Sequence, residues 1–300
     1  MSSPPVAASL TNRFPGLAPA SLLLAATTWG LLWYPYRLLE EVGLSGSLAS
    51  LLTYCLGLPP LLWLAWGRAR PTRGEFPWLL AVALSAGWTN LSYVLAVVQG
   101  EVMRVLLLFY LAPLWTVLFA RLILNERPGG AGYAVVVLAL AGAVVMLYRG
   151  GGLPLPVNVA EWLGLSSGLG FALSNVLIRK TRDIPIETRS LWIFAGVAVI
   201  AAVFASREAA ILPRLASLDG PHWLLAWGIV LALFLATFTV QHGLAHVSAN
   251  RAVVILLFEL VVAAFSSRWL ANELMDVREW LGGTMIVAAT LFSTRIKSHG

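Results

Sequence analysis

Ten long apolar stretches, separated by short polar segments, are the feature that most restricts how this chain can fold. Each is close to the about 20 residues that an α-helix needs to cross a bilayer. Lipid offers the backbone no hydrogen-bond partners, so a segment that spans it must pair its own N–H and C=O groups as a helix. The stretches are residues 14–36, 42–67, 76–100, 105–124, 128–148, 162–178, 190–206, 223–245, 252–270 and 280–294. They predict an all-α integral membrane protein with ten transmembrane helices.

The composition indicates the same class. Hydrophobic residues make up 59% of the chain and charged residues 11%, and the mean hydropathy is +0.82. A soluble domain has about 25% charged residues, so soluble, disordered and collagen-like chains are excluded. The single cysteine, Cys55, excludes a disulfide framework and a zinc site built from several cysteines. The pair His242 and His246 lacks the further ligands of a metal site, and we expect neither a metal nor another cofactor.

The basic residues of the loops are distributed unevenly between the two sides of the predicted bundle. Ten spans place both termini on one side, and that side collects twelve loop Arg and Lys residues against six on the other. Cytoplasmic loops carry such an excess, so both termini are predicted to be cytoplasmic in a multi-pass protein of a bacterial inner membrane. The same rule explains the net charge of +6 without nucleic acid as a partner. Residues 1–15 lack a basic segment followed by a short apolar one, so we expect no cleaved signal peptide.

An internal repeat relates the two halves of the chain. The pattern Arg-x-x-x-Asn-Glu ends the fourth span at residues 121–126 and the ninth at residues 268–273, and the same offset of 147 places Arg104 on Arg251. An offset of 142 places Trp29 on Phe171 and Arg37 on Arg179. Residues 14–149 and 157–296 each hold five spans, an odd number, so the two halves are predicted to cross the membrane in opposite senses. Inverted repeats are typical of alternating-access carriers, with the substrate site near the midplane between them.

Several residues also resemble a known superfamily. Trp29-Gly30 lies in the first span, Tyr110-Leu-Ala-Pro113 in the fourth, and an Asn-Glu pair, expected to face water, ends spans four and nine. In these features the chain resembles the drug/metabolite transporter superfamily, and within it the ten-helix EamA-type exporters, most closely those that export aromatic amino acids. The resemblance covers residues 17–292. It implies a basket of ten helices around a central cavity, and export of amino acids rather than an enzymatic reaction.

Glu259 is the acidic residue that lies deep within a predicted span. An ionisable group there costs on the order of 3 kcal/mol, so it needs a partner or a function. Glu259 can bind a cation or the ammonium group of a substrate, or carry a proton. Alternatively, it is a protonated carboxyl group hydrogen-bonded to a neighbouring helix. Both interpretations stay open at this point.

Other mid-span side chains are candidates for the substrate site. Asn90 and Asn175 can bind the amino or carboxylate group of a substrate, or they can link helices. Aromatic side chains attract ammonium groups and stack on ring substrates, but they also pack helices together. The aromatic candidates are Trp29, Trp33, Tyr93, Phe109, Tyr110, Trp115 and Phe171.

Two arginines are candidates for gates. Arg104 and Arg251 begin spans four and nine at opposite ends of the bundle. Each either extends to the lipid headgroups or binds the opposite half in one state of the transport cycle.

The leading hypothesis is a secondary transporter that exports aromatic and other neutral amino acids with broad specificity. The alternative from the same superfamily is an exporter of drugs or lipophilic cations, which aromatic walls and Glu259 would suit. A membrane enzyme would need clustered Asp, His, Ser or Cys side chains within the spans, which the sequence lacks. We expect a monomer whose partners are its small-molecule substrate and the lipid bilayer.

Overall fold

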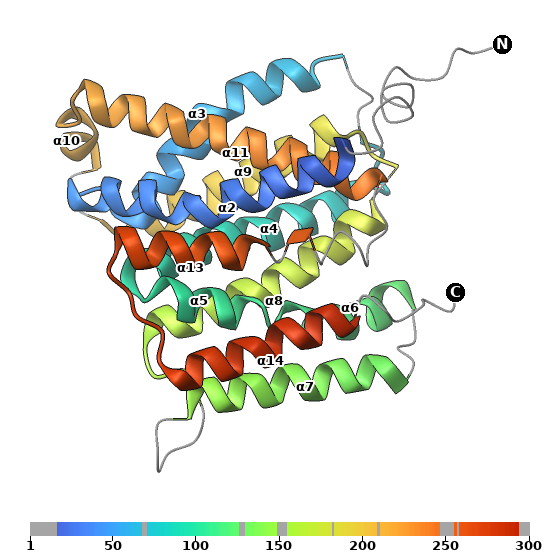
Figure 1. The fold of residues 1–300 in the computed structure, drawn as a ribbon. Helices are drawn as coiled ribbons and strands as arrows, with labels where there is room; N and C mark the ends of the chain where they lie inside the picture. The colour runs from blue at the N-terminus through green and yellow to red at the C-terminus, as the bar shows by residue number, and fades with distance from the viewer. Residues whose placement is uncertain are drawn as a thin grey trace.

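The computed structural model describes residues 17–67, 71–125, 130–148, 155–181, 183–208, 211–246, 255–256 and 258–293. Within these residues the chain forms helices joined by short connections (Figure 1). They are α2 (Leu17–Glu41), α3 (Gly46–Ala65), α4 (Phe76–Gln99), α5 (Val102–Phe109), α6 (Ala112–Leu124), α7 (Gly130–Leu147), α8 (Val159–Lys180), α9 (Ile186–Ala205), α10 (Ile211–Ala216), α11 (Gly220–His246), α13 (Phe258–Leu270) and α14 (Val277–Ser293). A helix lies in each of the ten predicted ranges, so the all-α class is confirmed.

Six helical segments of the described chain are long and apolar enough to cross a membrane. They are Leu17–Glu41, Gly46–Ala65, Phe76–Gln99, Val102–Leu124, Ile186–Ala205 and Gly220–Gly243. The remaining predicted spans correspond to α7, α8, α13 and α14. Trp63, Trp66 and Trp269 at span ends are 77%, 86% and 80% exposed, as expected for side chains at the boundary between lipid and water.

The fourth predicted span is not one continuous helix. It begins earlier than the predicted residue 105, at Val102, and it breaks at Tyr110 and Leu111, between α5 and α6. Pro113 lies in the first turn of α6. Proline has no backbone N–H and clashes with a preceding helical turn, so it favours a new helix start over an uninterrupted one.

The helices that pack together come in matched pairs. The repeat offsets relate α2 to α8, α3 to α9, α4 to α11, α5 and α6 to α13, and α7 to α14. The contact of α4 with α8 then corresponds to that of α11 with α2, and the contact of α4 with α9 to that of α11 with α3. The contacts of α5 and α6 with α8 correspond to that of α13 with α2, while α3–α9 and α7–α14 join equivalent helices. All of these contacts join one half to the other.

Two further observations agree with this relation. Asn125 and Asn272, 147 residues apart, have φ values of 56° and 55°, and within the described residues they are the two positive-φ positions that are not glycine. Asparagine tolerates this left-handed conformation, which ends helices. Figure 1 shows α2 and α8, which the repeat relates, beginning at opposite ends of the molecule.

We call the end where α5, α8 and α14 begin the Arg104 end, and the end where α2 begins and α14 finishes the terminus end.

Candidate substrate site between the halves

A hydrogen bond across the two halves joins Tyr110 to Glu259. The Tyr110 hydroxyl donates to Glu259 Oε2 at 2.8 Å, and it lies 3.3 Å from the carbonyl oxygen of Leu256. Tyr110 occupies the break between α5 and α6, and Glu259 lies in the first turn of α13. The break between α5 and α6 and the packing of α13 therefore place an acid and a phenol together at the interface between the halves.

Aromatic rings from both halves surround this pair. Phe109 lies at the centre of the group, with ring centroids 5.9 Å from Tyr93, 5.6 Å from Tyr110 and 4.9 Å from Phe171. Tyr93 comes from α4 and Phe171 from α8. The Tyr93 hydroxyl is buried and makes no hydrogen bond within the described structure. A polar atom in this state loses the hydration it would have in water.

Trp33 joins α2 to α13 beside this cluster. Its side chain is fully buried, and the indole Nε1–H donates to Ser266 Oγ at 3.0 Å. The Arg37 guanidinium lies 4.9 Å from the centre of the Trp33 ring, within the range of a cation–π contact. α2 approaches α13 closely at Gly30, where an added Cβ would lie 2.9 Å from the Glu259 carbonyl oxygen. Trp33 therefore packs between α2 and α13 and links the two helices by a hydrogen bond.

The structure brings together part of the predicted site. Trp33, Tyr93, Tyr110 and Phe171 share one core cluster next to Glu259. In this conformation the rings of Tyr93, Tyr110 and Phe171 pack against Phe109.

The other candidates lie elsewhere. Asn90 Oδ1 accepts a hydrogen bond from the Tyr54 hydroxyl at 2.7 Å, and Asn90 Nδ2 donates to the Ala86 carbonyl at 2.8 Å. Asn90 therefore links α3 to α4, one of its two predicted roles. Trp29 packs against a separate core cluster, and Asn175 is half-buried on α8. The Trp115 indole N–H is buried on α6 without a partner in the described structure.

An ionic network lies at the Arg104 end. Arg104 Nε lies 3.0 Å from Glu161 Oε1, and Arg104 Nη1 lies 2.9 Å from Glu279 Oε1. Arg37 Nη2 lies 3.1 Å from Glu273 Oε1, and Glu273 Oε2 accepts the Val102 N–H at 2.8 Å. In each case an arginine of the first half binds an acid of the second. Arg104 is 7% exposed, so it does not extend to the lipid headgroups.

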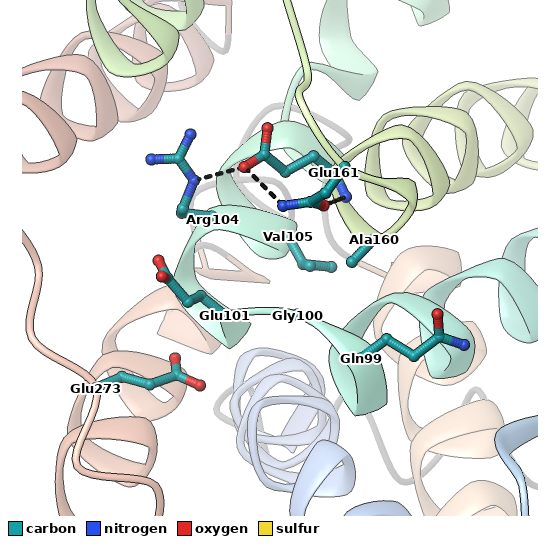
Figure 2. Close-up of a pocket in the computed structure, with 9 residues that line it drawn as sticks. Gln99, Gly100, Glu101, Arg104, Val105, Ala160, Glu161 and Glu273 are labelled. Carbon is teal, nitrogen blue, oxygen red and sulfur yellow. Dashed lines mark hydrogen bonds and ion pairs between the residues drawn. The ribbon is translucent and has the colours of Figure 1, made fainter. Parts of the chain in front are cut away.

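Two cavities adjoin this network. Figure 2 shows one of them, with the Arg104 guanidinium facing the Glu161 carboxylate. Its volume is about 270 Å³, and its lining includes Gln99, Gly100, Glu101, Arg104, Glu161 and Glu273. The other, of about 430 Å³, is lined by Glu101, Arg104, Tyr148, Leu274, Asp276, Arg278 and Glu279. Arg251, the predicted counterpart of Arg104, lies outside the described residues.

Sequence reasoning missed three of these acids. Glu273 was expected to face water, but it is half-buried because it binds both Arg37 and the start of α5. Glu161 and Glu279 follow Asn158 and Asp276 by three residues, a helix-start pattern that was visible in the sequence. That pattern predicts the helix start, but it does not reveal that the carboxylate also binds a distant arginine.

Comparison with known proteins places the chain in a family. The sequence profile described as the EamA-like transporter family matches residues 17–148 and, a second time, residues 158–295. The chain belongs to this family. A protein of Archaeoglobus fulgidus described as an uncharacterized transporter is 26% identical over 219 residues, covering 72% of this chain and 76% of that protein. A solved crystal structure superposes with a TM-score of 0.60 at 20% identity, covering 93% of this chain and 99% of that chain, which indicates a shared fold. The chain is thus a multi-pass membrane transporter of the drug/metabolite transporter superfamily.

Proposed function

We propose that this protein exports amino acids, aromatic and other neutral ones, by alternating access of two inverted five-helix halves. The double match to one family profile, the matched helix contacts and the Asn125–Asn272 equivalence support two repeated halves. With five spans in each half, the second half is inverted relative to the first. Inverted halves that rock about a central site are a common design of secondary transporters.

The observation that carries the substrate proposal is the hydrogen bond from Tyr110 to Glu259 between the halves. The ammonium group of an amino acid can replace the tyrosine hydroxyl as the partner of the carboxylate. α6 begins two residues after Tyr110, and helix N-termini attract carboxylate groups, so both charged groups of a zwitterion have a partner here. Phe109, Tyr93 and Phe171 supply ring surfaces for an apolar or aromatic side chain.

Binding at this site requires the aromatic cluster to separate. The site then comprises Trp33, Tyr93, Tyr110, Phe171 and Glu259, with Trp29, Trp115 and Asn175 as further candidates, while Asn90 keeps its bond to Tyr54. Arg104 and Arg251 act as gates at opposite ends. The excess of basic residues at the terminus end makes it the cytoplasmic end in a bacterial inner membrane, so the Arg104 end is the exit. A monomer contains the complete site.

An exporter of lipophilic cations is the second candidate, because the same carboxylate with aromatic neighbours suits a cation without a carboxylate. The two candidates differ in what the start of α6 contributes. An amino acid needs a partner for its own carboxylate, whereas a cation does not.

Transport by purified protein in liposomes distinguishes them. A panel of labelled neutral amino acids is offered with and without a pH gradient, next to labelled tetraphenylphosphonium and protein-free liposomes. We expect saturable uptake of phenylalanine and tryptophan that the unlabelled amino acids inhibit, and the pH gradient reports whether protons are exchanged. Uptake of tetraphenylphosphonium alone would establish the alternative, and uptake of neither would refute both.

A further inference from the structure

The ionic triad of Arg104, Glu161 and Glu279 is buried, although its residues lie at the end of the helix bundle. The three residues are 7%, 2% and 5% exposed, and both distances are close to 3 Å. Arg104 belongs to α5 of the first half, whereas the glutamates belong to α8 and α14 of the second. Removing one partner of such a buried pair leaves an uncompensated charge, which is strongly destabilising unless water reaches it. The halves therefore cannot separate at this end without exposing all three groups.

Both glutamates are also held by hydrogen bonds at the start of their own helices. Glu279 Oε2 accepts the Asp276 N–H at 3.0 Å, and Asp276 Oδ1 accepts the Glu279 N–H at 2.8 Å, which is a capping box at the start of α14. Glu161 Oε2 accepts the Val157 N–H at 3.0 Å, and the Asn158 side chain caps the start of α8. Glu279 uses one oxygen for its own helix start and the other for Arg104, whereas Glu161 Oε1 binds both Arg104 and, at 3.3 Å, the Asn158 side-chain amide. The second half thus presents a rigid receptor for the guanidinium.

The repeat does not provide this receptor at the other end. The offsets of 142 and 147 that align the helix starts place Glu161 on Pro19 and Glu279 on Gly132. Neither residue has a charge. The neighbouring pair behaves differently, because Arg37 and Glu273 correspond to Arg179 and Glu126, which preserve both charges. The two glutamates of the triad therefore have no acidic counterpart at the repeat-related positions of the terminus end.

We propose that the Arg104–Glu161–Glu279 triad is a one-sided latch that makes the conformation closed at the Arg104 end the resting state. Two identical inverted halves would give the two end-closed conformations equal free energies, and a contact present at one end removes that equality. Glu161 and Glu279 are then the residues that release Arg104 each time substrate leaves. The inference rests on the proposed alternating access, and it adds which end is closed and which residues close it.

Distances between spin labels at the two ends test the latch. Labels are placed on a Cys55→Ala background, in lipid nanodiscs without substrate. One pair, Val42→Cys with Val157→Cys, joins the halves at the Arg104 end, and a second pair, Arg73→Cys with Phe292→Cys, joins them at the terminus end; all four positions are exposed. In the labelled protein that keeps Glu161 and Glu279, most molecules should show the shorter distance between the two labels at the Arg104 end, which corresponds to the closed conformation.

The double variant Glu161→Gln, Glu279→Gln removes the charges while glutamine keeps the helix-start contacts. We expect the ratio of open to closed molecules at the Arg104 end to rise at least tenfold, which corresponds to about 1.4 kcal/mol. The terminus end should shift toward its short distance in the same sample. Asp219→Asn is the matched control, because Asp219 is an exposed acid of the second half that accepts a hydrogen bond from the His222 N–H. That variant should leave both distributions unchanged.

Unchanged distances in the folded double variant would overturn the latch. If the double variant does not fold, Glu279→Gln alone should give half the free-energy change, which is about a threefold rise in the ratio of open to closed molecules at the Arg104 end. An unchanged ratio in this single variant would also overturn the latch. A rise at the Arg104 end with no response at the terminus end would show that the triad closes that end, but it would refute alternating access and, with it, the assignment of a resting state. The distances are measured without substrate, so the two tests are independent. Absence of amino-acid uptake in the liposome assay would refute the proposed substrate and leave the test of the latch unchanged.

Discussion

The contact between α4 and α9, one helix from each half, depends on glycine at position 196. A Cβ added to Gly196 would lie 2.1 Å from the carbonyl oxygen of Ala83 and 2.6 Å from its carbonyl carbon. Non-bonded Cβ atoms do not approach other atoms closer than 3.0 Å, and here the obstacle is backbone, which cannot rotate away as a side chain can. The helices would have to separate by close to an ångström along this contact. Gly196→Ala therefore tests whether the halves meet as closely as the structure indicates.

Overpacking of a well-packed interior costs typically 1–3 kcal/mol, and the backbone clash places Gly196→Ala at the upper end, about 3 kcal/mol. Each kcal/mol lowers the Tm by roughly 2–4 °C in a chain of this size, so we expect a decrease of about 6–12 °C. The measurement is thermal unfolding of the purified protein in detergent, followed by tryptophan fluorescence.

Gly228→Ala is the matched control. Gly228 lies within α11, and an added Cβ there would meet no atom within 4 Å. Alanine favours helix more than glycine does, so the Tm of this variant should stay the same or rise. If Gly196→Ala unfolds at the same temperature as the native protein and Gly228→Ala, α4 and α9 do not approach as described, and the packing of the two halves is wrong.

Two further predictions concern topology and Asn90. Reporter fusions at the C-terminus and within residues 150–156 should report opposite sides of the membrane; the same side for both would contradict the ten spans and the inverted repeat. Tyr54→Phe removes the hydroxyl that donates to Asn90, so the free energy of unfolding should fall by about 1 kcal/mol, seen as a lower Tm. Amino-acid uptake per folded molecule should be unchanged. A selective loss of uptake in Tyr54→Phe would instead return Asn90 to the substrate site.

The helices were predictable from the sequence because the lipid requirement acts locally. A stretch of about 20 apolar residues must be helical in a bilayer, whatever surrounds it. The break at Tyr110 and Leu111 did not follow from the apolar stretch of residues 105–124, since a proline either bends a helix or starts a new one. The motif at residues 121–125 and 268–272 predicted the repeat, and the φ values of Asn125 and Asn272 now give that motif a structural meaning.

The partners of polar side chains were not predictable in the same way. Asn90 had two open interpretations, and the choice depended on Tyr54, which lies 36 residues away on another helix. Glu279 is 175 residues from Arg104, and its helix-start role already accounted for its presence in the sequence. Contacts of this kind depend on how helices face one another, and a single sequence contains no direct record of that.

Glu259 is the residue on which the proposed substrate site depends. Glu259→Gln keeps the shape of the side chain and an acceptor for the Tyr110 hydroxyl, but removes the charge that would bind an ammonium group or carry a proton. Glu75→Gln is the matched control, because Glu75 is an acid in the segment before α4 that accepts hydrogen bonds from Thr72.

The decisive measurement is the initial rate of phenylalanine uptake into liposomes by the native protein, Glu259→Gln and Glu75→Gln, normalised to folded protein. The account predicts that Glu259→Gln lowers the rate at least about tenfold, roughly 1.4 kcal/mol in the limiting step, while Glu75→Gln does not. A Glu259→Gln variant that transports phenylalanine at the native rate, with the native pH dependence, would contradict the account.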